Sequence, residues 1–523
     1  MSDTEVQAFG KFRSFIWPIH RYELRKFLPM LFMMFLVCFN YSIVRNLKDT
    51  VVVTASGAEV IPFIKLWAML PGAVLLTLFY TYLSSHYSQE RAFYIMVTMF
   101  ICFYTLFGFV LYPFRDQLHP HHLTETLSVA LPEGFSGLIA MLCNWSFTIF
   151  YVMCELWGSL VLSVIFWGVA NEVTRLSEAR RFYSVFSIFS NIAAIAAGQS
   201  ANYLASGNRA GFAFNFFTTD SFEQGLMFLM LLVSLCGIVI MVIFRWMNKN
   251  VLNDSSFDEL HKNKSELKKN KKKLSLKDSF SFLSNSNYLL CIAILVLAYN
   301  LTINLAEVVW KDQLRTLKPE PEEFNRFLNN VTSAIGCVST LMSLFMARLF
   351  AKFGWTRTAM ITPVIMLISC MGFFAFMIFQ GTLGPIAFAL TGLTPLTIAV
   401  AFGAMQNCFS KAMKYSVFDA TKEMAFIPLD HETKLNGKAA IDGVGSRCGK
   451  SGGSLIHQGL ILVFGSLTAS ASYVAIIILA VITGWITAVR SLGVQFANVA
   501  RNEDKALAEG QLNDENEVQA VSA

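Results

Sequence analysis

Twelve apolar runs, each long enough to cross a lipid bilayer, most constrain what this chain can fold into. An α-helix needs about 20 residues to cross the hydrocarbon core. The runs lie at about 28–48, 60–83, 92–112, 138–168, 182–204, 224–246, 286–310, 327–350, 358–380, 385–410, 439–466 and 470–492. Because 55% of the 523 residues are hydrophobic and only 15% are charged, a water-soluble fold would not cover so much apolar surface. The sequence therefore predicts an all-α polytopic membrane protein with twelve transmembrane helices.

A lysine-rich polar segment divides the runs into two groups of six. We expect the two six-helix halves to be related as parallel repeats. Asn46-Leu-Lys-Asp49 near the end of the first run is echoed by Asn304-Leu-Ala-Glu307 near the end of the seventh. The predicted parts are an interfacial arm (1–27), the N-terminal half (28–247), a basic linker (248–284), the C-terminal half (285–493) and an acidic disordered tail (494–523).

Lysine and arginine gather in alternate loops, which predicts that both termini are cytoplasmic. The loop 311–326 departs from this pattern with four basic residues, which three glutamates partly offset. The total of 41 basic against 35 acidic residues reflects this loop asymmetry and does not indicate a nucleic-acid partner. The ten cysteines are scattered through apolar runs and predict neither a disulfide framework nor a metal site.

The stretch 437–453 ends like a phosphate-binding loop, with Gly449-Lys450-Ser451. A Walker A motif needs a glycine five residues before Gly449, and Val444 occupies that position. The motif also needs a preceding strand and a following soluble helix, whereas an apolar run follows here. The stretch is therefore interpreted as part of a transmembrane helix.

Glycines recur every four residues along this predicted helix, at Gly445, Gly449 and Gly453, which is typical of close helix packing. Arg447 and Lys450 lie on the adjoining face. A cation within the bilayer is costly and is therefore usually functional. We expect both cations to face a polar cavity.

The first run carries Tyr41, Arg45 and Lys48 at positions that share one helical face. Lys48 lies near the end of the run, so its ammonium group could instead extend to the interface. Arg45 lies one turn deeper, where such an extension is harder. The pattern favours a functional role for the pair.

Carboxylates also lie inside predicted spans. Glu155 is in the middle of the fourth run, on a polar face that includes Tyr151. Glu307 shares a face with Asn304 and Lys311 in the seventh run, and an intrahelical pair between Glu307 and Lys311 is the alternative to a functional role. Lys411 ends the tenth run, where a solvated helix extension explains most of the charges.

These charged residues come from separate helices and predict a central cavity with surplus positive potential. The set consists of Arg45, Lys48, Arg447 and Lys450 against Glu155 and Glu307. An anionic substrate would displace the cations from the carboxylates and so couple occupancy to conformation. Repulsion between uncompensated cations would make the empty site reorient slowly. The sequence therefore predicts a transporter of an anion.

Four separated motifs carry a resemblance to a known family. They are Arg45-Asn-Leu-Lys-Asp-Thr-Val-Val-Val-Thr54, Cys154-Glu-Leu-Trp-Gly158, Asn304-Leu-Ala-Glu-Val-Val-Trp-Lys311 and Gly443-Val-Gly-Ser-Arg-Cys-Gly-Lys-Ser451. In this order they resemble the ATP/ADP translocases, or nucleotide transport proteins, of plastids and obligate intracellular bacteria. The resemblance covers nearly the whole chain, except for the N-terminal arm and the acidic tail.

The resemblance implies a major-facilitator-like arrangement that exchanges external ATP for internal ADP by alternating access. The family's pair of lysines and pair of glutamates would correspond to Lys48, Glu155, Glu307 and Lys450. It implies a transporter rather than an enzyme, located in a bacterial inner membrane and drawing on the energy of a host. The loop 84–91 lacks the glycine and arginine pair of typical facilitators, so the gating contacts are expected to differ.

On this interpretation the lysines, helped by Arg447 and Arg45, bind phosphate oxygens by charge-assisted hydrogen bonds. The glutamates hold these cations in the empty state or contact the base and ribose. An aromatic ring among Tyr41, Tyr151 and Trp157 would support the purine. The expected partners are ATP, ADP and the lipid bilayer, without a cofactor, metal or nucleic acid, and the chain is expected to be a monomer.

Two alternatives remain open at the level of sequence. A proton-coupled nucleotide importer of the same fold would use Glu155 or Glu307 as its titrating group. A membrane enzyme acting on ATP would use Lys450 on the phosphates. The sequence disfavours the enzyme because it lacks Walker A and Walker B motifs and a soluble catalytic domain.

Overall fold

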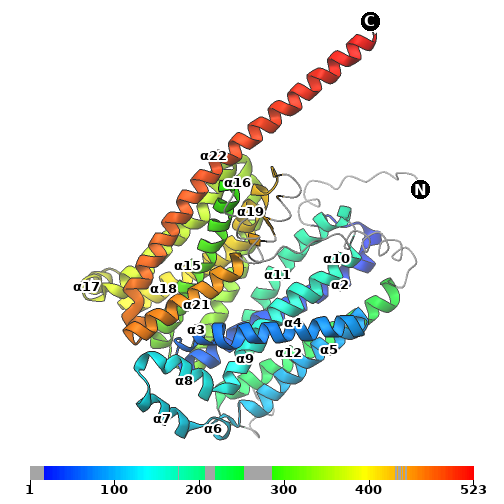
Figure 1. The fold of residues 1–523 in the computed structure, drawn as a ribbon. Coiled ribbons are helices and arrows are strands. Elements are labelled where there is room, and N and C mark those ends of the chain that lie inside the picture. The colour runs from blue at the N-terminus through cyan, green and yellow to red at the C-terminus, as the bar shows by residue number, and fades with distance from the viewer. Residues whose placement is uncertain are drawn as a thin grey trace. The chain divides into compact units, whose positions relative to one another are not determined.

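The computed structural model is helical throughout the part of the chain that it describes, and no strand occurs there (Figure 1). The described residues are 17–174, 176–205, 218, 220–252, 286–429, 433, 437–438, 440–441 and 445–522. Most of the predicted linker and the first part of the predicted N-terminal arm lie outside these ranges.

The elements before the linker follow in this order: η1 (Arg21–Glu23), α2 (Leu24–Ser56), α3 (Val60–Phe63), η2 (Ile64–Ala68), α4 (Met69–His86), α5 (Gln89–Leu106), η3 (Phe107–Leu111), α6 (Arg115–Leu118), α7 (His121–Ala130), η4 (Glu133–Phe135), α8 (Ser136–Cys143), α9 (Trp145–Leu156), η5 (Trp157–Phe166), α10 (Trp167–Val173), α11 (Leu176–Ala205), α12 (Ser221–Met247) and η8 (Asn248–Leu252). After the linker come α15 (Asn287–Leu317), α16 (Pro321–Ile378), α17 (Gln380–Thr391), α18 (Pro395–Met413), η9 (Lys414–Phe418), α19 (Asp419–Ala425), α21 (Ser446–Phe464) and α22 (Leu467–Ser522).

Ten helices in the described residues are long and apolar enough to cross a membrane. An eleventh candidate is the pair Gln380–Thr391 and Pro395–Ala425, which is bent by 86°. The all-α, multi-span prediction is confirmed, whereas the count of twelve stays a prediction. The run predicted at 439–466 corresponds to α21, which is not among these ten helices.

Helix α2 is the centre of the first part of the fold. It packs against α11, α12 and α9, and its side chains are buried along most of its length (Figure 1). The helix ends at Gly57, whose φ of 86° lies in the left-handed region that favours glycine. Because α2 has neighbours on several sides, charged groups on it are removed from lipid.

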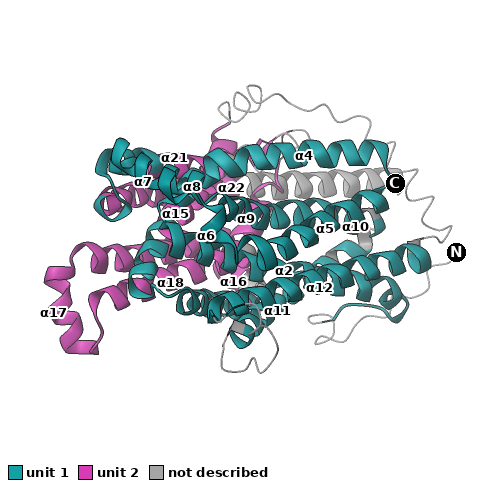
Figure 2. Cartoon of the chain, turned by 90° about the horizontal axis from the view of Figure 1, so that it is seen from below, with its two compact units in different colours: residues 1–271, 308–340, 458–469 teal, residues 272–307, 341–457, 470–523 magenta. Residues whose placement is uncertain are grey.

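Two compact units divide the chain (Figure 2). Unit 1 consists of residues 1–271, 308–340 and 458–469, and unit 2 consists of residues 272–307, 341–457 and 470–523. The boundaries in the described residues fall inside α15, α16, α21 and α22. Unit 1 therefore contains one end of each of these helices in addition to the helices before the linker.

Two of the π-helical segments directly follow a helix that carries a predicted site residue or a nearby charge. Segment η5 continues α9 just after Glu155, and η9 continues α18 just after Lys411. Such π segments within α-helices are frequent at functional sites.

The last helix, α22, continues to Ser522 and so passes through the segment for which the sequence predicts disorder. Alanine, glutamate and glutamine are common there, and these residues have high helix propensity. The division of the chain into an arm, two halves, a linker and a tail stays a prediction.

Candidate functional site

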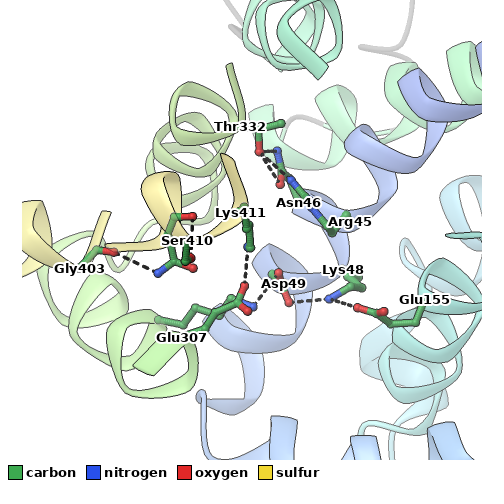
Figure 3. Close-up of polar contacts among 12 residues, drawn as sticks. Arg45, Asn46, Lys48, Asp49, Glu155, Glu307, Thr332, Gly403, Ser410 and Lys411 are labelled. Carbon is green, nitrogen blue, oxygen red and sulfur yellow. Dashed lines mark hydrogen bonds and ion pairs between the residues drawn. The ribbon is translucent and has the colours of Figure 1, made fainter. Parts of the chain in front are cut away.

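Lys48 on α2 is a buried cation held by two carboxylates (Figure 3). Its Nζ lies 3.0 Å from Oε1 of Glu155 and 2.8 Å from Oδ1 of Asp49, and its side chain is only 2% exposed. The ammonium group also lies 3.8 Å from the centre of the Tyr151 ring. Lys48 therefore does not extend to an interface, and that alternative is wrong.

The motif around Glu155 places the carboxylate by packing two helices closely. Gly158 lies against the ring of Tyr41 on α2, where an added Cβ would collide. The indole of Trp157 donates a hydrogen bond to the carbonyl oxygen of Val37 at 3.2 Å. Tryptophan and glycine thus fix α9 and η5 against α2, which brings Glu155 within reach of Lys48.

The three aromatic residues considered for the purine differ in their surroundings. Trp157 and Tyr151 are almost completely buried, the first between helices and the second against Lys48. Tyr41 is half-buried, and the Arg45 guanidinium carbon lies 5.7 Å from the centre of its ring. In the described arrangement Tyr41 is the one of the three that retains partial exposure.

Arg45 on α2 contacts α16. Its guanidinium donates a hydrogen bond of 3.3 Å to the hydroxyl of Thr332 on α16, within unit 1. The side chain is half-buried.

Two further charged residues complete this cluster, and the sequence analysis did not select them. The second carboxylate oxygen of Asp49 lies 2.8 Å from Nζ of Lys311, which α15 contributes to unit 1. The sequence placed Lys311 in a possible pair with Glu307 on its own helix, and the structure shows an ion pair of Lys311 with Asp49. The signal for Asp49 was its place beside Lys48 in the first of the four motifs.

Glu307 forms an ion pair in unit 2 with a residue from a different helix (Figure 3). Its Oε1 accepts a hydrogen bond of 3.0 Å from Nζ of Lys411 on α18. The side chains of Glu307 and Lys411 are 18% and 20% exposed. The interpretation of Lys411 as part of a solvated helix extension is therefore wrong, because most of this side chain is buried against a carboxylate.

Helix α21 packs on α15 through its glycines, as predicted for two of the three. A Cβ on Gly449 would lie 2.8 Å from Cβ of Asn300, and one on Gly453 would lie 3.2 Å from Cβ of Asn304. The Asn304 amide donates a hydrogen bond to the backbone carbonyl oxygen of Lys450. Asn304 therefore fixes the backbone of α21 at the lysine, within unit 2.

Helix α21 carries two cations, Arg447 and Lys450. Lys450 is exposed, in contrast to Lys48. The side chain of Arg447 lies outside the described residues.

The chemistry of these clusters is that of reversible anion binding. Each holds a lysine ammonium group against a carboxylate, and phosphate oxygens make the same charge-assisted hydrogen bonds. Among the described residues there is no group of three or more histidine, cysteine, aspartate or glutamate side chains that could hold a metal ion. Lysine and carboxylate side chains alone can exchange one anion for another.

Comparison with known proteins gives a match over nearly the whole chain. The family model described as TLC ATP/ADP transporter matches residues 2–496. The chain is 44% identical to ADP,ATP carrier protein 1 of Chlamydia pneumoniae over 97% of this chain and 98% of that protein. It is 42% identical to the chloroplastic ADP,ATP carrier protein 1 of Arabidopsis thaliana over 92% of this chain and 75% of that protein.

Solved structures share the fold at low sequence identity. A bacterial homologue of the iron transporter ferroportin, in its inward-facing state, aligns with a TM-score of 0.57 at 14% identity, covering 91% of this chain and 99% of that one. A D-xylose-proton symporter aligns with a TM-score of 0.50 at 11% identity, covering 90% and 97%. These similarities support the major-facilitator-like fold predicted from the sequence.

Proposed function

Because the chain belongs to the TLC ATP/ADP transporter family, we propose that it exchanges external ATP for internal ADP across a membrane. The observation that carries this proposal is the 44% identity to an ADP,ATP carrier protein along almost the full length of both chains. The chain is a multi-pass membrane protein of a transporter family, which disfavours the reading as a membrane enzyme acting on ATP.

Lys48 and Lys450 bind the phosphates in this proposal, helped by Arg447 and Arg45. The buried position of Lys48 supports its role, because an ammonium group removed from water binds an anion more strongly than one in solvent. Lys450 is exposed and its backbone carbonyl is fixed by Asn304, which supports its role as a first contact.

Glu155 and Glu307 hold the cations while no nucleotide is bound. Their ion pairs with Lys48 and Lys411 support this assignment. Each nucleotide phosphate brings oxygens that replace the carboxylate at the ammonium group, so that binding exchanges one set of charge-assisted hydrogen bonds for another. Tyr41, Tyr151 and Asn304 are the proposed contacts of the base and ribose.

We also propose a bacterial inner membrane as the location, with both termini cytoplasmic and a monomeric chain. The alternation of basic loops along the sequence supports the orientation. Alternating access between two conformations then moves the nucleotide across the bilayer.

The experiment that tests the function is uptake of labelled ATP into proteoliposomes that contain the purified protein. Liposomes loaded with ADP should take up ATP rapidly, and liposomes without internal nucleotide should take up little. Uptake that needs a pH gradient and ignores internal ADP would instead identify a proton-coupled importer. Release of phosphate from ATP by the purified protein would favour an enzyme.

A further inference from the structure

Four charged side chains form one continuous chain of ion pairs inside unit 1 (Figure 3). Glu155 on α9 contacts Lys48 at 3.0 Å, Lys48 contacts Asp49 at 2.8 Å, and Asp49 contacts Lys311 on α15 at 2.8 Å. The side chains of Lys48, Asp49 and Lys311 are 2%, 7% and 4% exposed. We call these four residues the charge chain.

Asp49 is the bridging member of the charge chain. One of its carboxylate oxygens faces Lys48 and the other faces Lys311, so each oxygen serves a different cation. The four groups carry two positive and two negative charges and are therefore balanced. The expectation that uncompensated cation repulsion controls the empty state stays a prediction.

The charge chain crosses a seam between α2 and residues 308–340. On one face of α2, Asn46 donates to Oδ1 of Asn329 at 2.8 Å and Thr50 donates to Oδ1 of Asn325 at 3.3 Å. At the end of the same face the carbonyl oxygen of Thr54 accepts a hydrogen bond of 3.3 Å from Arg315. The interface between residues 308–340 and the face of α2 that carries Asn46, Asp49, Thr50 and Thr54 is called the α2 seam.

The α2 seam contains these hydrogen bonds and also the ion pair between Asp49 and Lys311. The same carboxylate also holds Lys48, which is the proposed phosphate ligand. A change at Lys48 therefore reaches the seam through a single side chain.

We propose that Asp49 is the positioning residue that couples nucleotide binding at Lys48 to opening of the α2 seam, with Lys311 as its fixed counter-ion. The inference rests on the proposed function, in which Lys48 binds phosphate. Phosphate oxygens compete with Asp49 and Glu155 for the Lys48 ammonium group. Once Lys48 turns to the phosphate, Asp49 loses its contact with Lys48 and keeps that with Lys311, and the seam opens more easily in the loaded protein than in the empty one.

This coupling gives a physical reason for strict exchange. The empty protein keeps the balanced charge chain and stays closed at the seam. Its empty binding site therefore reorients slowly from one side of the membrane to the other. A loaded protein has exchanged Asp49 for phosphate at Lys48 and changes conformation readily. A ligand shifts a conformational equilibrium only through its different affinity for the two states, and the competition at Lys48 supplies that difference.

The test is the ratio of two rates in proteoliposomes: uptake of labelled ATP without internal nucleotide, and uptake against internal ADP. Asp49→Asn should raise this ratio by about tenfold or more, because the empty protein is no longer held at the seam. Asp49→Glu keeps a carboxylate and should keep the ratio near the wild-type value. Lys318→Gln, which breaks an exposed pair with Glu323 near the end of α15, is the matched control and should leave it unchanged.

A second variant keeps the test decisive if Asp49→Asn does not fold. Asp49→Asn combined with Lys311→Gln removes one charge of each sign and should raise the ratio in the same way. General destabilisation lowers both rates together and leaves their ratio unchanged. Folded variants that still take up ATP only against internal nucleotide would overturn the inference, whereas wild-type protein without any ATP/ADP exchange would overturn the proposed function.

Discussion

Burial separates the two lysines that are proposed to bind phosphate. Lys48 is 2% exposed and ion-paired, whereas Lys450 is exposed. Lys450→Ala should therefore lower exchange by about 10- to 100-fold, the size of a lost charge-assisted hydrogen bond, with little change in thermal stability. Lys48→Ala should abolish exchange and also destabilise the fold by about 3–5 kcal/mol, because it leaves two carboxylates buried without their shared cation.

Exchange rates in ADP-loaded proteoliposomes and thermal unfolding of the detergent-solubilised protein measure these two effects. Lys268→Ala, in the predicted linker and outside the described residues, is the control and should behave as wild type. Normal exchange by Lys450→Ala would contradict the proposed site.

The sequence predicted some of the charged residues of the site but not the ion pairs between distant residues. Lys48 and Glu155 were predicted because an unpaired charge inside an apolar run would be costly in the bilayer. Asp49 was not selected, because adjacent residues on a helix point in different directions and Asp49 is next to Lys48. The pairs Asp49–Lys311 and Glu307–Lys411 join residues more than 100 positions apart, and nothing in helical spacing indicates such contacts.

A histidine outside the membrane spans gives a pH dependence of stability. Burial lowers the pKa of His119 below its ordinary value, and the nearby His121 adds to the effect. Its Nε2 lies 2.7 Å from the Ser146 hydroxyl. The folded protein therefore favours neutral His119, and this stability is present above the ordinary histidine pKa and is lost as the pH falls below it.

The corresponding measurement is thermal unfolding at pH 7.5 and pH 5.5. The wild-type unfolding temperature should fall at the lower pH, and His119→Gln should show a smaller fall. His122→Gln, at an exposed position on α7, should keep the wild-type difference. An equal fall in all three proteins would show that His119 does not contribute.

At the scale of the helix, α21 offers two glycines with opposite surroundings. A Cβ on Gly449 would lie 2.8 Å from Cβ of Asn300, whereas one on Gly452 would meet nothing within 4 Å. Gly449→Ala should therefore destabilise the protein by about 1–3 kcal/mol through overpacking. Gly452→Ala should stabilise it by up to about 1 kcal/mol, because alanine has the higher helix propensity.

Thermal unfolding of the two variants side by side tests the predicted contact between α21 and α15. Both substitutions add one methyl group to the same helix, so differences in expression or detergent affect them alike. Equal stability of the two variants would mean that the glycines do not bring the helices together.

The two ion pairs on the long helices repeat one arrangement with reversed charge. Lys48 on α2 pairs with Glu155 on α9, just before η5, and Glu307 on α15 pairs with Lys411 on α18, just before η9. This correspondence fits the predicted relation between the two halves as parallel repeats. The two arrangements differ in register by one residue, because the echo in the sequence aligns Glu307 with Asp49, the neighbour of Lys48.

Lys411→Gln should accordingly lower exchange by about 10- to 100-fold, since it removes the charge-assisted hydrogen bond that orients Glu307. Lys438→Gln is the control, because Lys438 pairs with Glu423 at a position where both side chains are 46% exposed. Exposed ion pairs contribute little to stability. Exchange by Lys411→Gln at the wild-type rate would contradict the repeated arrangement.

The apolar runs predicted most helices of the fold and left two elements uncertain. Ten runs correspond to helices that are long and apolar enough to span. The run at 385–410 is broken between α17 and α18, and the run at 439–466 corresponds to a helix with glycines and charges. Hydropathy identifies a span by its average, so a bend or a polar face is the feature that it misses.

At the scale of the whole molecule, these two elements decide on which side of the membrane the C-terminus lies. If α21 spans the bilayer together with the bent pair, the number of spans is twelve and both termini lie on one side. If α21 does not span, eleven spans place the termini on opposite sides. The basic loops favour twelve, because they recur in alternate positions in both parts of the chain.

Labelling of single cysteines in intact cells distinguishes the two topologies. In a variant without the ten native cysteines, Ser2→Cys and Ser522→Cys should both resist a membrane-impermeant maleimide. Ser128→Cys should react, because it is exposed on α7, between the third and fourth spans and therefore outside the cell in the twelve-span topology. A permeant maleimide should label all three. Reaction at Ser522→Cys without reaction at Ser2→Cys would show an odd number of spans, so that either α21 or the bent pair does not cross.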